Sequence, residues 1–112
     1  MKLTITRRDS EGASTLALEG SVDLVTRQAL VEAGRDVLAE GKALTLDMAA
    51  VDFIDSTGLG SLVELSREAA ARDAVMVVAP RSPRVERVFE LTGLDRVWAA
   101  APSLVSASTV DR

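Results

Sequence analysis

Residues 51–60 read VDFIDSTGLG, and this stretch decides the fold because a strand that crosses the core should turn into a helix here. Its first four residues are mostly apolar and can lead the chain through the core. Asp55, Ser56 and Thr57 then supply three side chains that can cap a helix. From residue 59 to residue 70 the apolar residues fall on one helical stripe and the charged residues lie elsewhere. We therefore expect a strand, a short junction and an amphipathic helix.

The preceding half of the chain predicts a strand hairpin, a helix and a central strand. Residues 3–6 and 15–20 alternate apolar and polar side chains on either side of a glycine-containing turn. The pattern then takes a helical period between Thr26, which can cap the helix, and Gly41, which can end it. Residues 43–48 are β-capable and follow this helix, so we expect a strand reached by a crossover connection.

The following half of the chain predicts another buried strand and a third helix. Residues 74–79 form a continuous apolar run, which is typical of a strand buried on both faces. The Ser-Pro pair at 82–83 can start a helix that Gly93 ends. We further expect a short last strand over residues 95–98 and a loosely packed terminal helix over residues 102–110.

Length and composition agree with one domain built from these elements. A chain of 112 residues can bury one core and is too short for two, and 47% hydrophobic with 27% charged residues is usual for a globular protein. We therefore expect residues 1–112 to form a single α/β domain. Its mixed β-sheet should have four to five strands, beginning with an N-terminal hairpin, packed against about four α-helices.

The composition also excludes many functions. The chain has no histidine and no cysteine, which removes Ser-His-Asp triads, thiolate nucleophiles, disulfides and most zinc sites. A net charge of -4 without a basic run argues against a nucleic-acid partner and against an anionic membrane. The start of the chain lacks a signal-peptide pattern, and no uncharged stretch approaches the ~20 residues of a membrane span. We expect a cytoplasmic protein that is not an enzyme and needs no metal or cofactor.

The junction at residues 55–60 is suited to an anion or to contact with another molecule. The first N–H groups of a helix lack internal partners, and the helix dipole adds partial positive charge there. Gly58 and Gly60 leave the first turn without side chains. A local interpretation stays open, in which Asp55 or Ser56 only caps the helix and the glycines only allow close packing. A nucleotide site is a weaker alternative, because neither a third glycine at Rossmann spacing nor a P-loop lysine is present.

Three stretches together resemble one protein family. Residues 53–60 (FIDSTGLG) resemble the Asp-Ser-Ser/Thr-Gly-Leu-Gly signature of STAS-domain anti-sigma-factor antagonists. Residues 18–26 (LEGSVDLVT) resemble that family's Leu-x-Gly-Glu-Leu-Asp-x-x-Thr junction, except that Ser21 replaces the usual glutamate. Residues 91–98 (LTGLDRVW) resemble its Leu-Thr-Gly-Leu helix end, although a simple helix stop would read the same way. The resemblance covers nearly the whole chain in the right order.

This resemblance implies a phosphorylation switch. Ser56 matches the serine that is phosphorylated by the partner, an anti-sigma factor that is also a serine kinase, and Thr57 matches a neighbouring hydroxyl that is usually not the acceptor. Asp23 and Asp55 match aspartates that would help present Ser56. The unphosphorylated chain would bind the kinase and free a sigma factor, phosphorylation would release the chain, and a serine phosphatase would restore it.

We accordingly expect one partner surface at the start of the second helix. It would consist of Asp23, Asp55, Ser56, Thr57, Gly58 and Leu59, together with part of the helix. Asp23 could instead be a local turn carboxylate, and Leu59 could instead begin the buried stripe.

Two other functions stay open. The chain could be a constitutive STAS scaffold subunit of a transporter, lipid-trafficking or signalling complex, with the same docking face and no phosphorylation. It could also be an enzyme that uses carboxylates as acid, base or metal ligands. The candidates for that chemistry are Asp23, Asp47, Asp52 and Asp55.

Overall fold

A computed structural model describes residues 2–98, which form a mixed sheet of four strands and three helices. Strands β1 (Leu3–Ser10) and β2 (Ala13–Val22) pair antiparallel as the predicted N-terminal hairpin. Strands β3 (Ala43–Ile54) and β4 (Met76–Arg81) then extend the sheet in parallel, so that the strand order is β1-β2-β3-β4. The predicted α/β domain with a mixed sheet is therefore confirmed.

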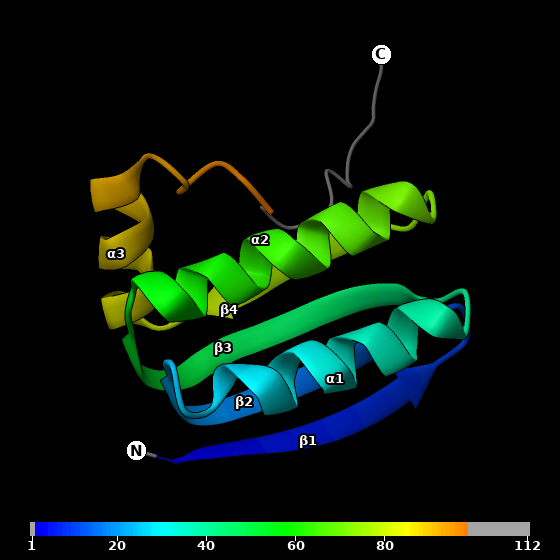
Figure 1. The fold of residues 1–112 in the computed structure, drawn as a ribbon, viewed down its shortest axis with the longest axis horizontal. Coiled ribbons are helices and arrows are strands. Elements are labelled where there is room, and N and C mark those ends of the chain that lie inside the picture. Colours follow the sequence, from blue (N-terminus) through cyan, green and yellow to red (C-terminus); the bar gives the residue numbers. More distant parts are fainter. Residues whose placement is uncertain (1, 99–112) are drawn as a thin grey trace.

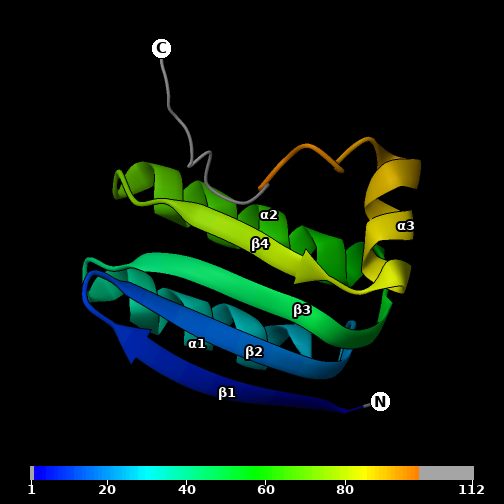
Figure 2. The same cartoon turned by 180° about the vertical axis from the view of Figure 1, so that it is seen from behind.

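The helices lie on one face and at one end of this sheet. Helices α1 (Arg27–Ala39) and α2 (Ser56–Ala71) run side by side over one face, and α3 (Pro83–Thr92) stands at the end where β3 and β4 finish (Figure 1). Seen from behind, the strands lie in front of both long helices, and no helix of residues 2–98 covers this second face (Figure 2). The domain is thus one layer of helices on one sheet. No helix among these residues is long and apolar enough to cross a membrane.

The core lies between the sheet and the α1–α2 layer and is mainly aliphatic. In the first part of β2, up to Leu18, and of β3, up to Met48, every second residue is buried, which is the period that a half-buried strand needs. Bulges between β2 and β3 interrupt this alternation beyond these residues. Residue pairs such as Leu16 with Leu46 align the apolar rows of neighbouring strands. The largest fully buried side chains are Phe89, Leu16, Leu18, Leu30, Leu38, Leu44, Leu46, Met48, Leu62 and Leu65.

The sequence signals for helix ends are confirmed at most positions. Gly41 and Gly93 follow α1 and α3 with φ angles of 78° and 76°, a conformation that favours glycine. Ser82 caps α3, since its Oγ accepts a hydrogen bond from the Val85 N–H at 3.1 Å, and Pro83 is the first helical residue. The same Ser82 hydroxyl donates to the Val51 carbonyl at 2.6 Å, which fixes α3 against β3.

The predicted last strand over residues 95–98 is wrong, because these residues form turns. A single backbone bond, from the Val78 N–H to the Trp98 carbonyl, joins them to β4. Arg81 donates to the carbonyls of Asp95 and Val97, which a strand would have paired, and Trp98 takes a left-handed φ of 59°. The segment is therefore held by a side chain and not by a ladder. The terminal helix predicted over residues 102–110 lies outside the described residues.

Candidate partner-binding site

The candidate site lies at the edge where the parallel strands β2 and β3 end and where α1 and α2 begin (Figure 1). Val22 and Ile54 are paired at the last position of these strands. The Val22 carbonyl also accepts a hydrogen bond from the Asp55 N–H at 3.4 Å. Asp23 and Ser56 are 33 positions apart in the sequence, but each comes just after the end of one of these two paired strands.

Asp55 is the cap of α2. Its backbone is extended, and its Oδ1 accepts hydrogen bonds from the Gly58 N–H at 2.9 Å and from the Thr57 hydroxyl at 2.6 Å. The Thr57 hydroxyl first, and then the Gly58 N–H, lower the pKa of Asp55 below its ordinary value. Asp55 is consequently a carboxylate at neutral pH. Of the two capping residues that the sequence left open, the structure selects Asp55 over Ser56.

Ser56 is the first residue of α2 and is exposed. Its hydroxyl makes no hydrogen bond with another of residues 2–98, whereas the neighbouring Thr57 is half-buried and its hydroxyl is committed to Asp55. Of these two adjacent hydroxyls, only that of Ser56 is free to be reached from solvent.

Gly58 is buried beneath the first turn of α2. A Cβ atom there would lie 2.9 Å from both the Val22 carbonyl carbon and Ile54 Cγ1, and closer still to the Val22 carbonyl oxygen, distances that real Cβ atoms essentially never show. This glycine lets α2 begin directly on the end of β2. Gly60, by contrast, is exposed and has open space around it.

Leu59 is half-buried and packs against the core cluster. Its side chain therefore contributes to the packing of α2 and still offers part of its surface at the candidate site. Leu59 thus combines the two interpretations that the sequence left open, because it belongs partly to the buried stripe and is partly exposed at the candidate site.

Asp23 lies in the turn between β2 and α1 and is only 6% exposed. Its Oδ1 accepts hydrogen bonds from the Val25 N–H at 3.0 Å and the Thr26 N–H at 3.1 Å. Thr26 stands at the N-cap position of α1, but its side chain does not cap the helix. Its hydroxyl oxygen accepts instead from the Asp23 N–H at 3.0 Å, and its hydroxyl donates to the Ser21 carbonyl at 2.8 Å. The buried Asp23 carboxylate thus holds the turn together through its backbone hydrogen bonds. The side chains that the turn displays are Leu24, 70% exposed, and Val25.

Leu24 and Val25 were missed by the reasoning from sequence, which treated the junction through Asp23 alone. The available signal was a pair of apolar residues between Asp23 and the start of the helix, outside the helical stripe. Ser21, the departure from the family pattern, is buried at the end of β2, and its backbone bonds to Lys2 and Thr26 hold the junction in place.

The carboxylates considered for catalysis do not gather in one place. Asp23 and Asp55 are engaged in the two turns described above, Asp47 accepts from the Ala49 N–H at 3.1 Å, and Asp52 is exposed on β3. Within residues 2–98 no three acidic, histidine or cysteine side chains are placed to hold one metal ion.

Comparisons with known proteins find similar sequences and a similar structure. The family model described as the STAS domain matches residues 4–107. The anti-sigma-F factor antagonist RsfB of Mycobacterium tuberculosis is 35% identical over 108 residues, which are 96% of this chain and 88% of that protein. The anti-sigma-B factor antagonist of Listeria monocytogenes is 31% identical over 87% of this chain and 85% of its own length. The crystal structure of an anti-sigma factor antagonist from Mycobacterium paratuberculosis matches with a TM-score of 0.75 and 30% identity, covering 96% of this chain and 87% of that one.

Proposed function

This chain belongs to the STAS-domain family, and on that premise we propose that it is a bacterial anti-sigma-factor antagonist switched by phosphorylation of Ser56. In the unphosphorylated state it binds an anti-sigma factor that is also a serine kinase, and a sigma factor is released. Phosphorylated chain dissociates from the kinase, and a serine phosphatase regenerates the binding form. Such a switch acts in the cytoplasm, where sigma factors operate.

One observation carries this proposal: the Ser56 hydroxyl is exposed at the first position of α2 and bonds to no other residue of 2–98, on the edge of the sheet that the family motifs share. The adjacent Thr57 hydroxyl donates to Asp55 at 2.6 Å and is half-buried. A kinase would have to break that hydrogen bond to use Thr57, and would have no such cost at Ser56. The geometry therefore favours Ser56 as the acceptor.

The chemistry of the switch belongs to the partners. The Ser56 Oγ would attack the γ-phosphorus of ATP held by the kinase, a new O–P bond would form, and the bond to the β-phosphate oxygen would break to release ADP. The proton of the hydroxyl would pass to a base of the kinase. The phosphatase would later transfer the phosphoryl group to water. This chain is the substrate in both steps and not a catalyst.

The proposal is tested by phosphorylation of purified protein. Wild-type chain incubated with an anti-sigma factor serine kinase of the host bacterium and ATP should gain one phosphoryl group by mass spectrometry, and Ser56→Ala should gain none. Ser10→Ala is the matched control, because Ser10 is also exposed but lies on the hairpin at the far end of β1. It should be phosphorylated like the wild type.

The opposite results have defined meanings. Full phosphorylation of Ser56→Ala would place the acceptor elsewhere and overturn the assignment. A wild-type chain that binds its partner but never accepts phosphate would be the constitutive scaffold that the sequence left open.

A further inference from the structure

The turn between β2 and α1 exposes two adjacent large apolar side chains, Leu24 at 70% and Val25 at 76%. The other exposed large hydrophobic residues among residues 2–98 are single ones, namely Val75, Leu91 and Val97. Scattered exposed apolar residues are normal on a protein surface and need no explanation. An adjacent pair of exposed apolar side chains, at the same edge as the proposed phosphorylation site, does call for an explanation.

The turn that holds this pair is well ordered by buried hydrogen bonds. Asp23 Oδ1 accepts from the N–H groups of Val25 and Thr26, the Thr26 hydroxyl accepts from the Asp23 N–H at 3.0 Å, and the Arg27 N–H donates to the Asp23 carbonyl at 2.9 Å. Asp23 and Thr26 are both buried. The backbone of Leu24 and Val25 is therefore fixed before any partner arrives, and a partner loses little binding energy in ordering the turn.

The pair is continuous with the Ser56 site. The carbonyl of Val22, the residue before Asp23, accepts from the Asp55 N–H and lies directly against Gly58. On the other side of the turn, the Arg27 guanidinium donates to Glu64 of α2 at 2.7 Å. The turn is thus joined to α2 on both sides, and both views of the ribbon place it beside the start of α2 (Figures 1 and 2).

We propose that Leu24 and Val25 are the apolar anchor by which the kinase partner holds this domain while its active site faces Ser56. This inference rests on the proposed function and adds the contact that confers affinity. The occupant is the kinase, because a molecule that reaches the Ser56 hydroxyl approaches the same edge and meets the turn. Aliphatic side chains on a fixed turn fit an aliphatic cleft on the partner, since burying them away from water is favourable without any directional bond.

The anchor and the acceptor should have separable effects on the kinetics of phosphorylation. An apolar contact remote from the transferred phosphoryl group stabilises the bound ground state and the transition state equally. Its loss should therefore raise the KM of the kinase for this protein substrate and leave kcat unchanged. A variant that misplaced Ser56 would lower kcat instead.

The test is the double variant Leu24→Ser and Val25→Ser, measured with the purified kinase by calorimetric titration and by initial rates of phosphorylation. We expect affinity to fall at least tenfold, KM to rise by a similar factor and kcat to stay within about twofold, where tenfold corresponds to about 1.4 kcal/mol. Circular dichroism and thermal melting should match the wild type, because both side chains are exposed.

The matched controls are Val75→Ser and Leu91→Ser, which remove the same residue types from positions that are 58% and 73% exposed. Both should bind the kinase within about twofold of the wild type. Equal losses in these controls would show that the pair has no special part, and would overturn the anchor.

The remaining outcomes separate this inference from the function on which it rests. A double variant that binds normally, while wild-type Ser56 is still phosphorylated, overturns the anchor and leaves the switch intact. A wild-type chain that neither binds the kinase nor accepts phosphate removes both proposals. A double variant that changes self-association in ultracentrifugation, but not kinase affinity, assigns the pair to a contact between two copies and overturns the anchor.

Discussion

Two glycines in the first turns of α2 have opposite surroundings and should respond oppositely to substitution. At Gly58 an added Cβ would collide with the Val22 backbone, which is held by the sheet and cannot easily move. At Gly60 nothing lies within 4 Å of an added Cβ, and alanine is the better helix former. The first position therefore requires glycine for packing, and the second does not.

We predict that Gly58→Ala lowers the free energy of unfolding by about 1–3 kcal/mol, the usual cost of overpacking. Gly60→Ala, the control two residues further along the same helix, should raise it by about 0.5–1 kcal/mol. Urea unfolding monitored by circular dichroism measures both. A Gly58→Ala protein as stable as the wild type would show that α2 can lift off the end of β2 without cost.

The capping role of Asp55 leads to a second prediction at the residue scale. Asp55→Ala removes the acceptor for the Gly58 N–H and the Thr57 hydroxyl, and should cost about 0.5–2 kcal/mol of stability. Ser56→Ala removes an exposed hydroxyl without a hydrogen bond among residues 2–98, and should change stability by less than about 0.5 kcal/mol. Thermal melting of both variants compares the two. A larger loss of stability in Ser56→Ala than in Asp55→Ala would show that Ser56, and not Asp55, caps α2.

The start of the helix at the candidate site was predictable from sequence, but the orientation of the side chains around it was not. The spacing of residues 55–60 is enough to place a helix start at Asp55 or Ser56, because capping side chains and glycines carry local signals. It does not reveal that Asp23 points inward, since an aspartate before a helix can either cap a turn or face solvent. The exposure of Leu24 and Val25 depends on that choice, and so it became visible only in three dimensions.

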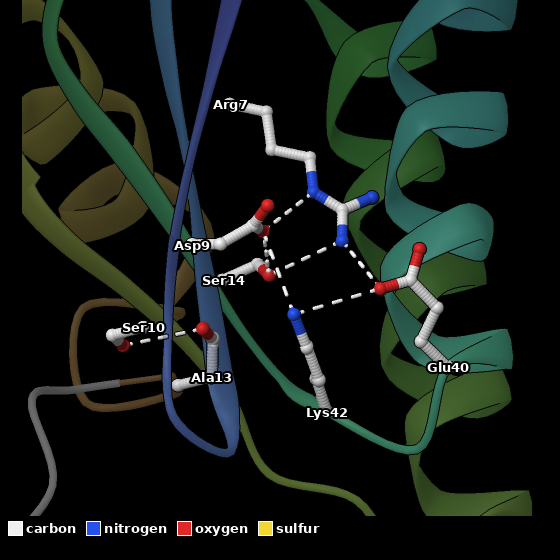
Figure 3. Close-up of polar contacts among 7 residues, drawn as sticks. All are labelled: Arg7, Asp9, Ser10, Ala13, Ser14, Glu40 and Lys42. Atoms are coloured by element: carbon white, nitrogen blue, oxygen red, sulfur yellow. Dashed lines mark hydrogen bonds and ion pairs between the residues drawn. The ribbon is translucent and has the colours of Figure 1, made fainter.

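At the scale of secondary-structure elements, a group of charged side chains joins the hairpin to the end of α1 (Figure 3). Arg7 on β1 donates to Asp9 at 2.7 Å and to Glu40 at 2.6 Å, and Lys42 lies within 3.7 Å of both carboxylates. Asp9 also accepts from the Ser14 hydroxyl at 2.5 Å. These contacts link β1, β2 and the α1–β3 connection at the end of the sheet away from Ser56.

This group should make the domain sensitive to acid. The Ser14 hydroxyl first, and then Arg7, lower the pKa of Asp9 from 3.8 to about 2, and Arg7 lowers the pKa of Glu40. A carboxyl group whose pKa is lower in the folded than in the unfolded state stabilises the fold at pH values above its unfolded pKa. This stabilisation is lost as the pH falls through the folded-state pKa. We therefore expect the urea midpoint to be steady from neutral pH to about pH 5, and to fall between about pH 4 and about pH 2.

The contribution of Asp9 is isolated by substitution. Asp9→Asn removes the titrating carboxylate and should flatten part of this acid-induced fall, since Ser14 and Arg7 no longer discriminate between two protonation states. Asp36→Asn is the control, because Asp36 is an exposed carboxylate on α1 that forms no ion pair within residues 2–98. An acid profile that is identical in Asp9→Asn and in the wild type would contradict the assignment.

The elements themselves were largely predictable, because periodicity and helix-end residues act locally. The hairpin, the three helices and the strand that leads to Ile54 lie where the patterns place them. The strand predicted over residues 74–79 is instead β4 at Met76–Arg81, and the prediction that it is buried on both faces is wrong, because no helix of residues 2–98 covers the second face of the sheet. The error at residues 95–98 has a tertiary cause. Arg81, 8% exposed as a side chain, takes the free carbonyls of that segment, and the Trp98 indole donates to Ser66 on α2 at 2.9 Å. No local pattern encodes such contacts.

At the scale of the whole molecule, the sheet separates the proposed partner-binding edge from the end that carries the charged group. The parallel strands β2 and β3 end beside the starts of α1 and α2, which brings Ser56, the Asp23 turn and two helix N-termini to one edge. The charged group at the opposite end closes the hairpin against α1. A modification of Ser56 should therefore affect partner binding without disturbing the stabilising contacts of the hairpin.

This separation predicts that phosphorylation of Ser56 abolishes partner binding without changing the fold. The phosphate adds about -1.5 to -2 charges at neutral pH. At the start of α2 that charge lies at the positive end of the helix dipole, a favourable interaction of about 0.3–1 kcal/mol, which offsets repulsion from the neighbouring Asp55. The free domain should accordingly melt at nearly the same temperature with and without phosphate.

Across the interface with the kinase the balance reverses, because the phosphate must lose water, occupies space meant for the partner and lies beside the ionised Asp55. A penalty of about 3 kcal/mol weakens binding more than a hundredfold, since each 1.4 kcal/mol is about tenfold. Circular dichroism, melting and calorimetric titration of both forms test this, with Ser10→Glu as a control that adds charge at the far end of the domain and should bind normally. A phosphorylated chain that binds as tightly as the unmodified one, or that loses its fold, would exclude a switch based on charge and exclusion.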